Sequence, residues 1–176
     1  MKTQALLLSL FLPLSSLVST PALAASEDEC AIWLCAPSGF PEGCDKAKAA
    51  MKMRIKQDKP PLPPYAACAI EDEEDAPIKS EETSVIHIRE HQRCVAWQRI
   101  STKNREERHC TKYETIPEQI VPGNSCYYGR SSTTRIEGCT GVYKKLSVVD
   151  TATNTPIGKP LYYQHNFGHV SFLLQK

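Results

Sequence analysis

The sequence lacks the short motifs that mark the commonest enzyme and cofactor sites. It has no glycine-rich phosphate loop, no Gly-x-Ser-x-Gly nucleophile elbow and no Cys-x-x-Cys pair. No clear pair of carboxylates stands in an apolar setting, as a general acid and base would need. Serine, histidine and aspartate occur, but no pattern marks them as a triad. We therefore expect a protein that is not an enzyme and that holds no cofactor and no metal.

The chain also lacks an excess of charge once residues 1–24 are set aside. The whole sequence has 21 Lys and Arg against 20 Asp and Glu, and Lys2 is the only charged residue in that first segment. The remainder therefore carries 20 basic and 20 acidic side chains, with a formal net charge of zero. General nucleic-acid binders normally have a strong basic excess. We expect no direct contact with nucleic acid, and any basic patch must be local.

Residues 1–24 have the features of a cleaved signal peptide. Lys2 supplies a positive start, residues 5–18 form an apolar run too short to span a bilayer, and residues 22–24 offer the small-x-small pattern of a cleavage site. The mature chain is expected to begin near Ala25. No second apolar run is long enough for a membrane anchor. The prediction is a protein exported to the periplasm or associated with the cell surface, without an integral membrane segment.

All eight cysteines follow this segment, in the part of the chain that would be exported. Oxidising compartments favour disulfides over free thiols and metal ligands, and an even number leaves none unpaired. We therefore expect disulfides that brace a small core, formed by Cys30, Cys35, Cys44, Cys68, Cys94, Cys110, Cys126 and Cys139.

Spacing predicts two of the pairings. Cys94 and Cys110 are symmetric about a polar turn at residues 101–104, which suits a hairpin with a bridge between its strands. Cys126 and Cys139 are symmetric in the same way about a second polar turn. We predict a disulfide within each of these two pairs.

Composition divides the mature chain into three segments and predicts an α+β fold. A helical pattern with four cysteines comes first, an acidic and polar stretch follows, and the remainder is rich in β-branched and aromatic residues. We interpret these as a disulfide-stapled helical module, an exposed acidic linker and an antiparallel β module rich in hairpins. With the signal peptide, the segments are 1–24, 25–70, 71–84 and 85–176.

The clearest helix of the first module covers residues 44–57. Its apolar positions share one stripe at helical spacing, namely Cys44, Ala47, Met51 and Ile55. A row of ammonium groups lies on the adjoining face, from Lys48, Lys52, Lys56 and Lys59. We predict that Lys48, Lys52 and Lys56 bind an acidic partner; the alternative is a solvated face that docks on the acidic linker. The pairing of the four cysteines stays open, and one arrangement joins Cys30 to Cys44 and Cys35 to Cys68.

The second module is predicted to consist of successive hairpins. Beyond the two hairpins that cysteines flank, residues 142–149 and 157–163 surround a turn and form a third candidate. Residues 170–174 are predicted to form a final strand. His165 and His169 are four residues apart, but Gly168 between them favours a turn or strand over a metal site.

One string resembles a catalytic motif. His87-Ile88-Arg89-Glu90-His91 matches the H-x-x-E-H pattern of inverted zinc peptidases. That motif works on a helix, where two imidazoles one turn apart bind one metal and the glutamate activates water. The neighbouring residues favour an extended chain, in which the two histidines are about 13 Å apart. A small exported zinc hydrolase using His87, Glu90 and His91 is therefore the alternative function, beside a secreted inhibitor or adhesin that presents stapled hairpins.

The first module resembles the TrbM-like family of exported conjugal transfer proteins. The resemblance rests on the Cys30–Cys35 pair, the Pro- and Gly-containing loop to Cys44, the basic helix that follows, and the closing Cys68. It does not extend to residues 85–176. It implies a periplasmic or surface-associated accessory of a conjugation or type IV secretion apparatus, whose partners are envelope components of that system. It implies no catalytic residues.

Overall fold

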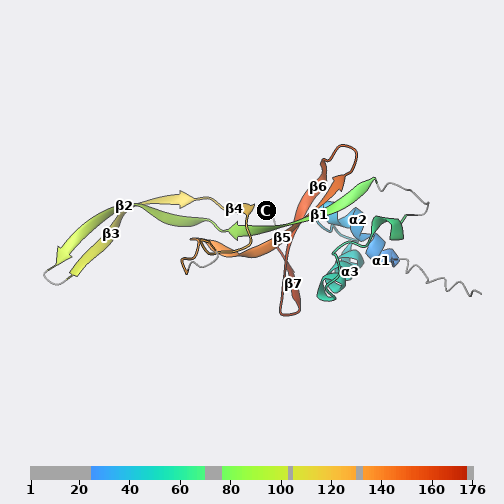
Figure 1. Ribbon diagram of the computed structural model, residues 1–176, viewed down its shortest axis with the longest axis horizontal. Helices are drawn as coiled ribbons and strands as arrows, with labels where there is room; N and C mark the ends of the chain where they lie inside the picture. Colours follow the sequence, from blue (N-terminus) through green and yellow to red (C-terminus); the bar gives the residue numbers. More distant parts are fainter. Residues whose placement is uncertain (1–24, 70–76, 103–104, 130–132, 174–176) are drawn as a thin grey trace, which may run out of the picture.

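The computed structural model describes residues 25–69, 77–102, 105–129 and 133–173. It has the predicted α+β architecture, with a disulfide-stapled helical region followed by antiparallel sheets (Figure 1). The predicted signal peptide and the first part of the predicted linker, residues 71–76, lie outside the described residues. Within the described ranges, no helix is long and apolar enough to cross a membrane.

The helical region consists of short elements that two disulfides tie together. Its elements are α1 (Glu27–Cys30), α2 (Ile32–Cys35), the 3₁₀ turn η1 (Ala36–Ser38), α3 (Asp45–Lys56) and the 3₁₀ turn η2 (Tyr65–Ala67). Cys30 is bonded to Cys68, and Cys35 is bonded to Cys44. The arrangement that joins Cys30 to Cys44 is therefore not the one formed.

Helix α3 confirms the helix predicted for residues 44–57, apart from one residue at each end. Three members of the apolar stripe, Ala47, Met51 and Ile55, are buried as predicted. The helix places them against α2 and the sheet, so that the adjoining lysine face stays at the surface.

Seven strands form two sheets that are antiparallel throughout. They are β1 (Ile78–Ile88), β2 (His91–Thr102), β3 (Arg105–Ile116), β4 (Gln119–Pro122), β5 (Cys139–Asp150), β6 (Pro156–Asn166) and β7 (His169–Phe172). The larger sheet has the strand order β4-β1-β5-β6-β7, while β2 and β3 form a sheet of their own. The β5–β6 hairpin and β7 confirm the predicted third hairpin and final strand.

Strand β1 begins inside the segment that was predicted to be an acidic linker. Residues 78–84 pair with β5, with Ser84 opposite Lys144. The linker prediction is wrong for these residues because their polar side chains, among them the exposed Glu81 and Glu82, hide the strand pattern. Backbone pairing with a strand far along the chain satisfies their hydrogen bonds instead.

The helical region and the larger sheet share one hydrophobic core. Ile32, Trp33 and Met51 from the helices pack in one cluster with Leu146 and Tyr163 from β5 and β6. The two predicted modules each keep their own disulfides, yet they form a single body.

Both pairings predicted from spacing are confirmed. Cys94 is bonded to Cys110, and Cys126 is bonded to Cys139. The second disulfide closes a loop and not a regular hairpin, because the described part of that loop has only an isolated bridge at Tyr127. Every cysteine of the chain is thus in a disulfide, which is consistent with an extracytoplasmic location.

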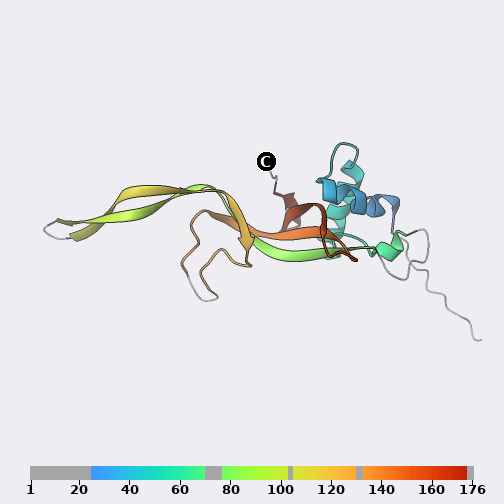
Figure 2. The same ribbon diagram turned by 90° about the horizontal axis from the view of Figure 1, so that it is seen from above.

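Strands β2 and β3 extend away from the body as a long two-stranded ribbon, here called the arm. Figures 1 and 2 show it at one end of the molecule, with the helical region at the other. The disulfide between Cys94 and Cys110 lies within the arm. Residues 103–104 at its turn lie outside the described residues.

Candidate functional site

The predicted lysine row lies alongside β7. The Nζ atoms of Lys48 and Lys52 are 5.4 Å and 5.5 Å from the centroid of the Phe172 ring, within cation–π distance. Lys56 is exposed. The row is therefore one continuous face, but its first two members already contact an aromatic ring of the chain itself.

The H-x-x-E-H string has the extended conformation that was expected. His87 lies in β1 and His91 in β2, which belong to different sheets, and Glu90 lies in the connection. The helix that the zinc peptidase motif needs is not formed by these residues. Among the described residues, no group of three or more His, Cys, Asp or Glu is placed to hold a metal ion.

His87 is buried and instead links Thr140 to the exposed Glu118 at the base of the arm. Its Nδ1 is 2.6 Å from Thr140 Oγ1, and its Nε2 is 2.7 Å from Glu118 Oε1. The Thr140 hydroxyl donates its hydrogen to the main-chain oxygen of His87 at 3.2 Å. Both ring nitrogens of His87 therefore have a polar partner within hydrogen-bond distance.

The contacts of His87 link three places in the fold: β1, β5 and the connection between β3 and β4 that carries Glu118. We interpret them as the joint that holds the arm to the body.

The variant His87→Ala is expected to lower the free energy of unfolding by about 2–3 kcal/mol, because it removes a buried side chain with a polar partner at each ring nitrogen. Urea denaturation at neutral pH measures this. His109→Ala is the matched control, since His109 is exposed on the arm and its loss should change stability by less than about 0.5 kcal/mol. Equal losses in the free energy of unfolding for the two variants would contradict the role of His87 in attaching the arm to the body.

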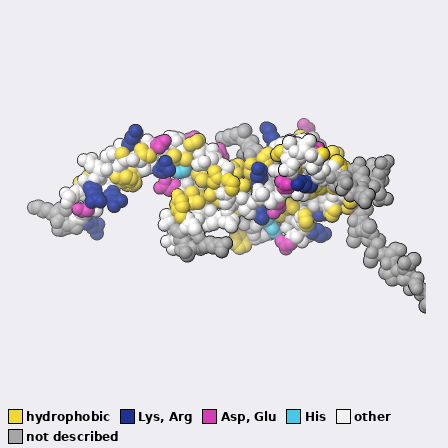
Figure 3. All heavy atoms as spheres, turned by 45° about the horizontal axis from the view of Figure 1, so that its top comes forward, with side chains coloured by type: hydrophobic (Ala, Val, Ile, Leu, Met, Phe, Trp, Pro, Cys, Tyr) yellow, Lys and Arg dark blue, Asp and Glu magenta, His cyan; other side chains and the backbone are white. Residues whose placement is uncertain are grey.

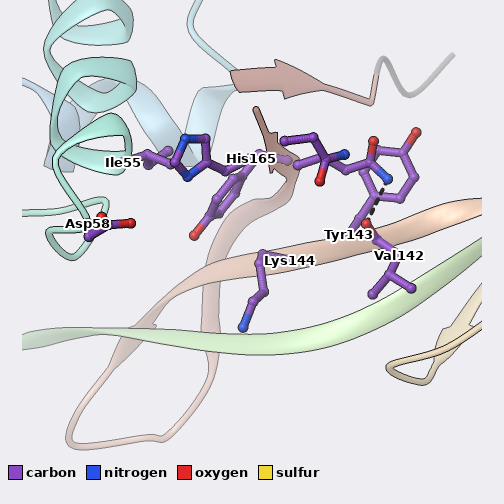
Figure 4. Close-up of a pocket in the computed structure, with 9 residues that line it drawn as sticks. Ile55, Asp58, Val142, Tyr143, Lys144 and His165 are labelled. Atoms are coloured by element: carbon purple, nitrogen blue, oxygen red, sulfur yellow. Dashed lines mark hydrogen bonds between the residues drawn. The ribbon is translucent and has the colours of Figure 1, made fainter. Parts of the chain in front are cut away.

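A cavity of about 370 Å³ lies between the end of α3 and the sheet (Figure 4). Its walls are formed by Ile55, Asp58, Val142, Tyr143, Lys144, Tyr163, Gln164, His165 and Asn166. In Figure 4, His165 lies beside Ile55, while the Lys144 side chain points away from both.

The strongest polar groups of this cavity already have partners in the chain. The Tyr163 hydroxyl donates a short hydrogen bond to Glu82, and Lys144 Nζ is 3.2 Å from the same carboxylate. Burial, together with Glu82, raises the pKa of Tyr163 above its ordinary value, so the phenol stays a neutral donor. Gln164 donates to the Val142 carbonyl at 2.7 Å. These three side chains are therefore held by contacts within the chain, while Asp58 and His165 also line the cavity.

The arm presents large apolar side chains to solvent on both faces. Val95, Trp97, Ile100 and Tyr113 are all exposed. Figure 3 shows hydrophobic and positively charged side chains interspersed along it, with Lys and Arg gathered near its free end. Trp and Tyr are among the residue types enriched at binding hot spots.

One face of the arm combines an aromatic ring with paired guanidinium groups. Trp97 and Arg99 are two residues apart in β2, so their side chains lie on the same face of the arm. Arg99 is paired with Arg108 on β3. Like charges directly opposite each other destabilise a strand pair. Within the described residues, neither guanidinium has an ion pair or hydrogen bond to offset this. The face is therefore suited to an external partner that brings negative charge.

Sequence reasoning placed Trp97 and Ile100 in a strand but did not foresee their exposure. The sequence feature that could have indicated this exposure is the presence of charged residues on both faces of both strands, which leaves neither face apolar enough to pack on a core. The polar contacts of His87 gave no local signal, because Glu118 and Thr140 are 31 and 53 residues away from it.

Comparison with protein-family models, with curated proteins and with solved structures finds no match to this chain. The fold and the arm define it as a disulfide-braced α+β protein with a projecting β-hairpin.

Proposed function

We propose that this protein is a non-enzymatic, extracytoplasmic binding protein that acts through protein–protein contacts, with the arm as its main contact surface. The observation that carries the proposal is the arm itself, which extends from the body and exposes Trp97, Tyr113 and two opposed arginines. Trp, Tyr and Arg are the residue types that contribute most often to binding hot spots.

The arm has a structure that favours recognition over stability. A two-stranded ribbon is marginal in water by itself, and this one has no covering layer to bury its apolar side chains. The disulfide between Cys94 and Cys110 restrains the ribbon before any partner binds. Such preorganisation reduces the entropy lost on association.

The biological setting that we propose is the envelope of a cell with a conjugation or type IV secretion apparatus. It follows from the resemblance of the Cys30–Cys68 region to the TrbM-like family. The signal-peptide pattern of residues 1–24 supports export to the periplasm, and the complete set of disulfides supports an oxidising compartment. The partners would be envelope components of that apparatus.

The test compares conjugation in a donor strain that lacks this chain and is complemented with variants. Replacing Trp97, Arg99 and Arg108 by threonine is expected to lower the transfer frequency about tenfold or more, because the hot-spot side chains are lost while strand propensity is kept. The matched control changes Gln98 and His109 to threonine, which face each other on the opposite side of the arm. The control should transfer like the unaltered chain.

Two results would contradict the proposal. One is normal transfer by the triple variant while mass spectrometry shows its Cys94–Cys110 disulfide intact. The other is normal transfer without the chain at all, which would remove the conjugation setting.

A further inference from the structure

The turn between β6 and β7 carries a large apolar side chain that packs against no other described part of the fold. Phe167 stands at the tip of this turn and is fully exposed. Its φ is 49° and that of Gly168 is 76°, so both central residues of the turn are left-handed, as in a type I′ turn. Asn followed by Gly suits such a turn, whereas a bulky aromatic residue is strained there. Phe167 therefore occupies a strained position and contributes no buried apolar surface to the fold.

Helix α3 runs along the β6–β7 hairpin towards this tip. Lys48 and Lys52 lie over the ring of Phe172 in β7. Further along, the last turn of α3 lines one cavity with His165, which lies close to the tip. Lys56 is one helical turn beyond Lys52 and is exposed. In Figure 1, α3 and the β6–β7 turn extend to the same side of the molecule. The lysine row therefore leads to the exposed phenylalanine.

The positive charge at this end of the molecule comes from α3. Residues 164–171 contain no Asp, Glu, Lys or Arg. Lys56 is exposed at the end of α3, and the acidic residue near it, Asp58, lines the cavity with His165. An exposed aromatic residue at the end of a row of lysines is a combination found on proteins that bind at the surface of an anionic membrane.

We propose that this end of the molecule binds peripherally to an anionic lipid surface. Phe167 inserts its ring below the headgroups, and Lys52 and Lys56 contact lipid phosphates. A protruding side chain can insert into a bilayer without a preformed pocket. Neither the apolar ring nor the lysines alone would give stable attachment, so both are needed. The contact is independent of the arm, which stays free for a protein partner.

The experiment measures co-sedimentation of the purified, disulfide-bonded protein with vesicles. Binding is expected to vesicles of phosphatidylcholine mixed with phosphatidylglycerol, to fall with added salt, and to be much weaker on phosphatidylcholine alone. Phe167→Asn should weaken binding about tenfold or more, because the apolar insertion is lost. The same substitution should raise Tm by about 2–4 °C, since Asn suits the left-handed turn position.

Two further variants separate insertion from simple charge attraction. Phe167→Trp should keep binding, and its emission should shift to the blue on the mixed vesicles but not in their absence. Lys56→Gln should weaken binding about fivefold. Trp97→Thr is the matched control for loss of an exposed aromatic residue, and it should leave vesicle binding unchanged.

Several outcomes would overturn the proposal. They are no binding to the mixed vesicles, binding that Phe167→Asn leaves unaltered, or binding of the Phe167→Trp variant without an emission shift. If Phe167→Asn reduces conjugation while the unaltered protein binds no vesicles, the tip binds an acidic protein surface with an apolar pocket and not lipid. None of these results bears on the arm, whose test is separate.

Discussion

Removing the Cys30–Cys68 disulfide, by replacing both residues with alanine, is expected to lower the free energy of unfolding by about 4 kcal/mol. This disulfide closes the longest loop of the four, with a sequence separation of 38. It ties the end of α1 to the residue after η2, so that α2, η1, α3 and η2 lie inside the loop. Domains of this size are stable by about 5–15 kcal/mol, so the loss is a large share of the total.

Urea denaturation followed by tryptophan fluorescence measures this effect. Trp33 is 7% exposed in the core, where it donates to the Pro63 carbonyl at 3.2 Å, while Trp97 is 60% exposed on the arm. In a Trp97→Phe background, the emission therefore reports on the core alone. The matched control is the Cys94/Cys110→Ala pair, whose loop lies within the arm and has a separation of 16.

The control pair is expected to leave the unfolding midpoint of the core almost unchanged, because the arm packs apart from the body. A core that unfolds at the same urea concentration with and without the Cys30–Cys68 disulfide would contradict the view that this bond braces the shared core. So would a large shift caused by the control pair.

The sequence allowed prediction of those features that depend on neighbours along the chain. Helix α3 follows from the spacing of Ala47, Met51 and Ile55, and the Cys94–Cys110 disulfide follows from symmetry about a polar turn. Both depend on short sequence separations, where periodicity and turn chemistry determine which residues meet.

Features that depend on distant partners could not be predicted. The first residues of β1 look like a linker until β5 pairs with them, 60 or more residues later. The pairing of Cys30 with Cys68 depends on how α1 and η2 pack around the core, and spacing carries no information on that. The lysine row was predicted to lie on one face, but its course along β7 depends on the packing of Phe172 against α3.

Arg54→Met is expected to lower the free energy of unfolding by about 3–5 kcal/mol, an effect comparable to loss of the Cys30–Cys68 disulfide. Arg54 is buried near the end of α3, and its Nη1 is 2.7 Å from Glu29 Oε1. It also donates to the carbonyls of Pro60 and Leu62, at 2.9 Å and 3.3 Å. Methionine fills a similar volume but leaves all three acceptors without this donor. The proline-containing segment after α3 would then lose its attachment to the helix.

The ionisation of Glu29 determines how the stability lost in Arg54→Met changes with pH. The hydrogen bond from Arg54, and after it the one from the Ser26 amide, hold the pKa of Glu29 below its ordinary value of 4.5. A carboxyl with a lowered folded pKa stabilises the fold fully above its unfolded pKa, and this contribution is lost as pH falls through the folded value. The difference between Arg54→Met and the unaltered chain should therefore be largest at neutral pH and shrink below about pH 4.5.

Glu29→Gln separates the two parts of the Arg54 effect. It removes the carboxylate but keeps the acceptors at Pro60 and Leu62 for the guanidinium, so its cost should be smaller than that of Arg54→Met. Its stability should also lose the part of the acid dependence that the Glu29 carboxyl provides, because the residue no longer titrates. A difference between Arg54→Met and the unaltered chain that stays constant from neutral pH to about pH 3 would show that the carbonyl contacts, and not the ion pair, hold α3 to α1.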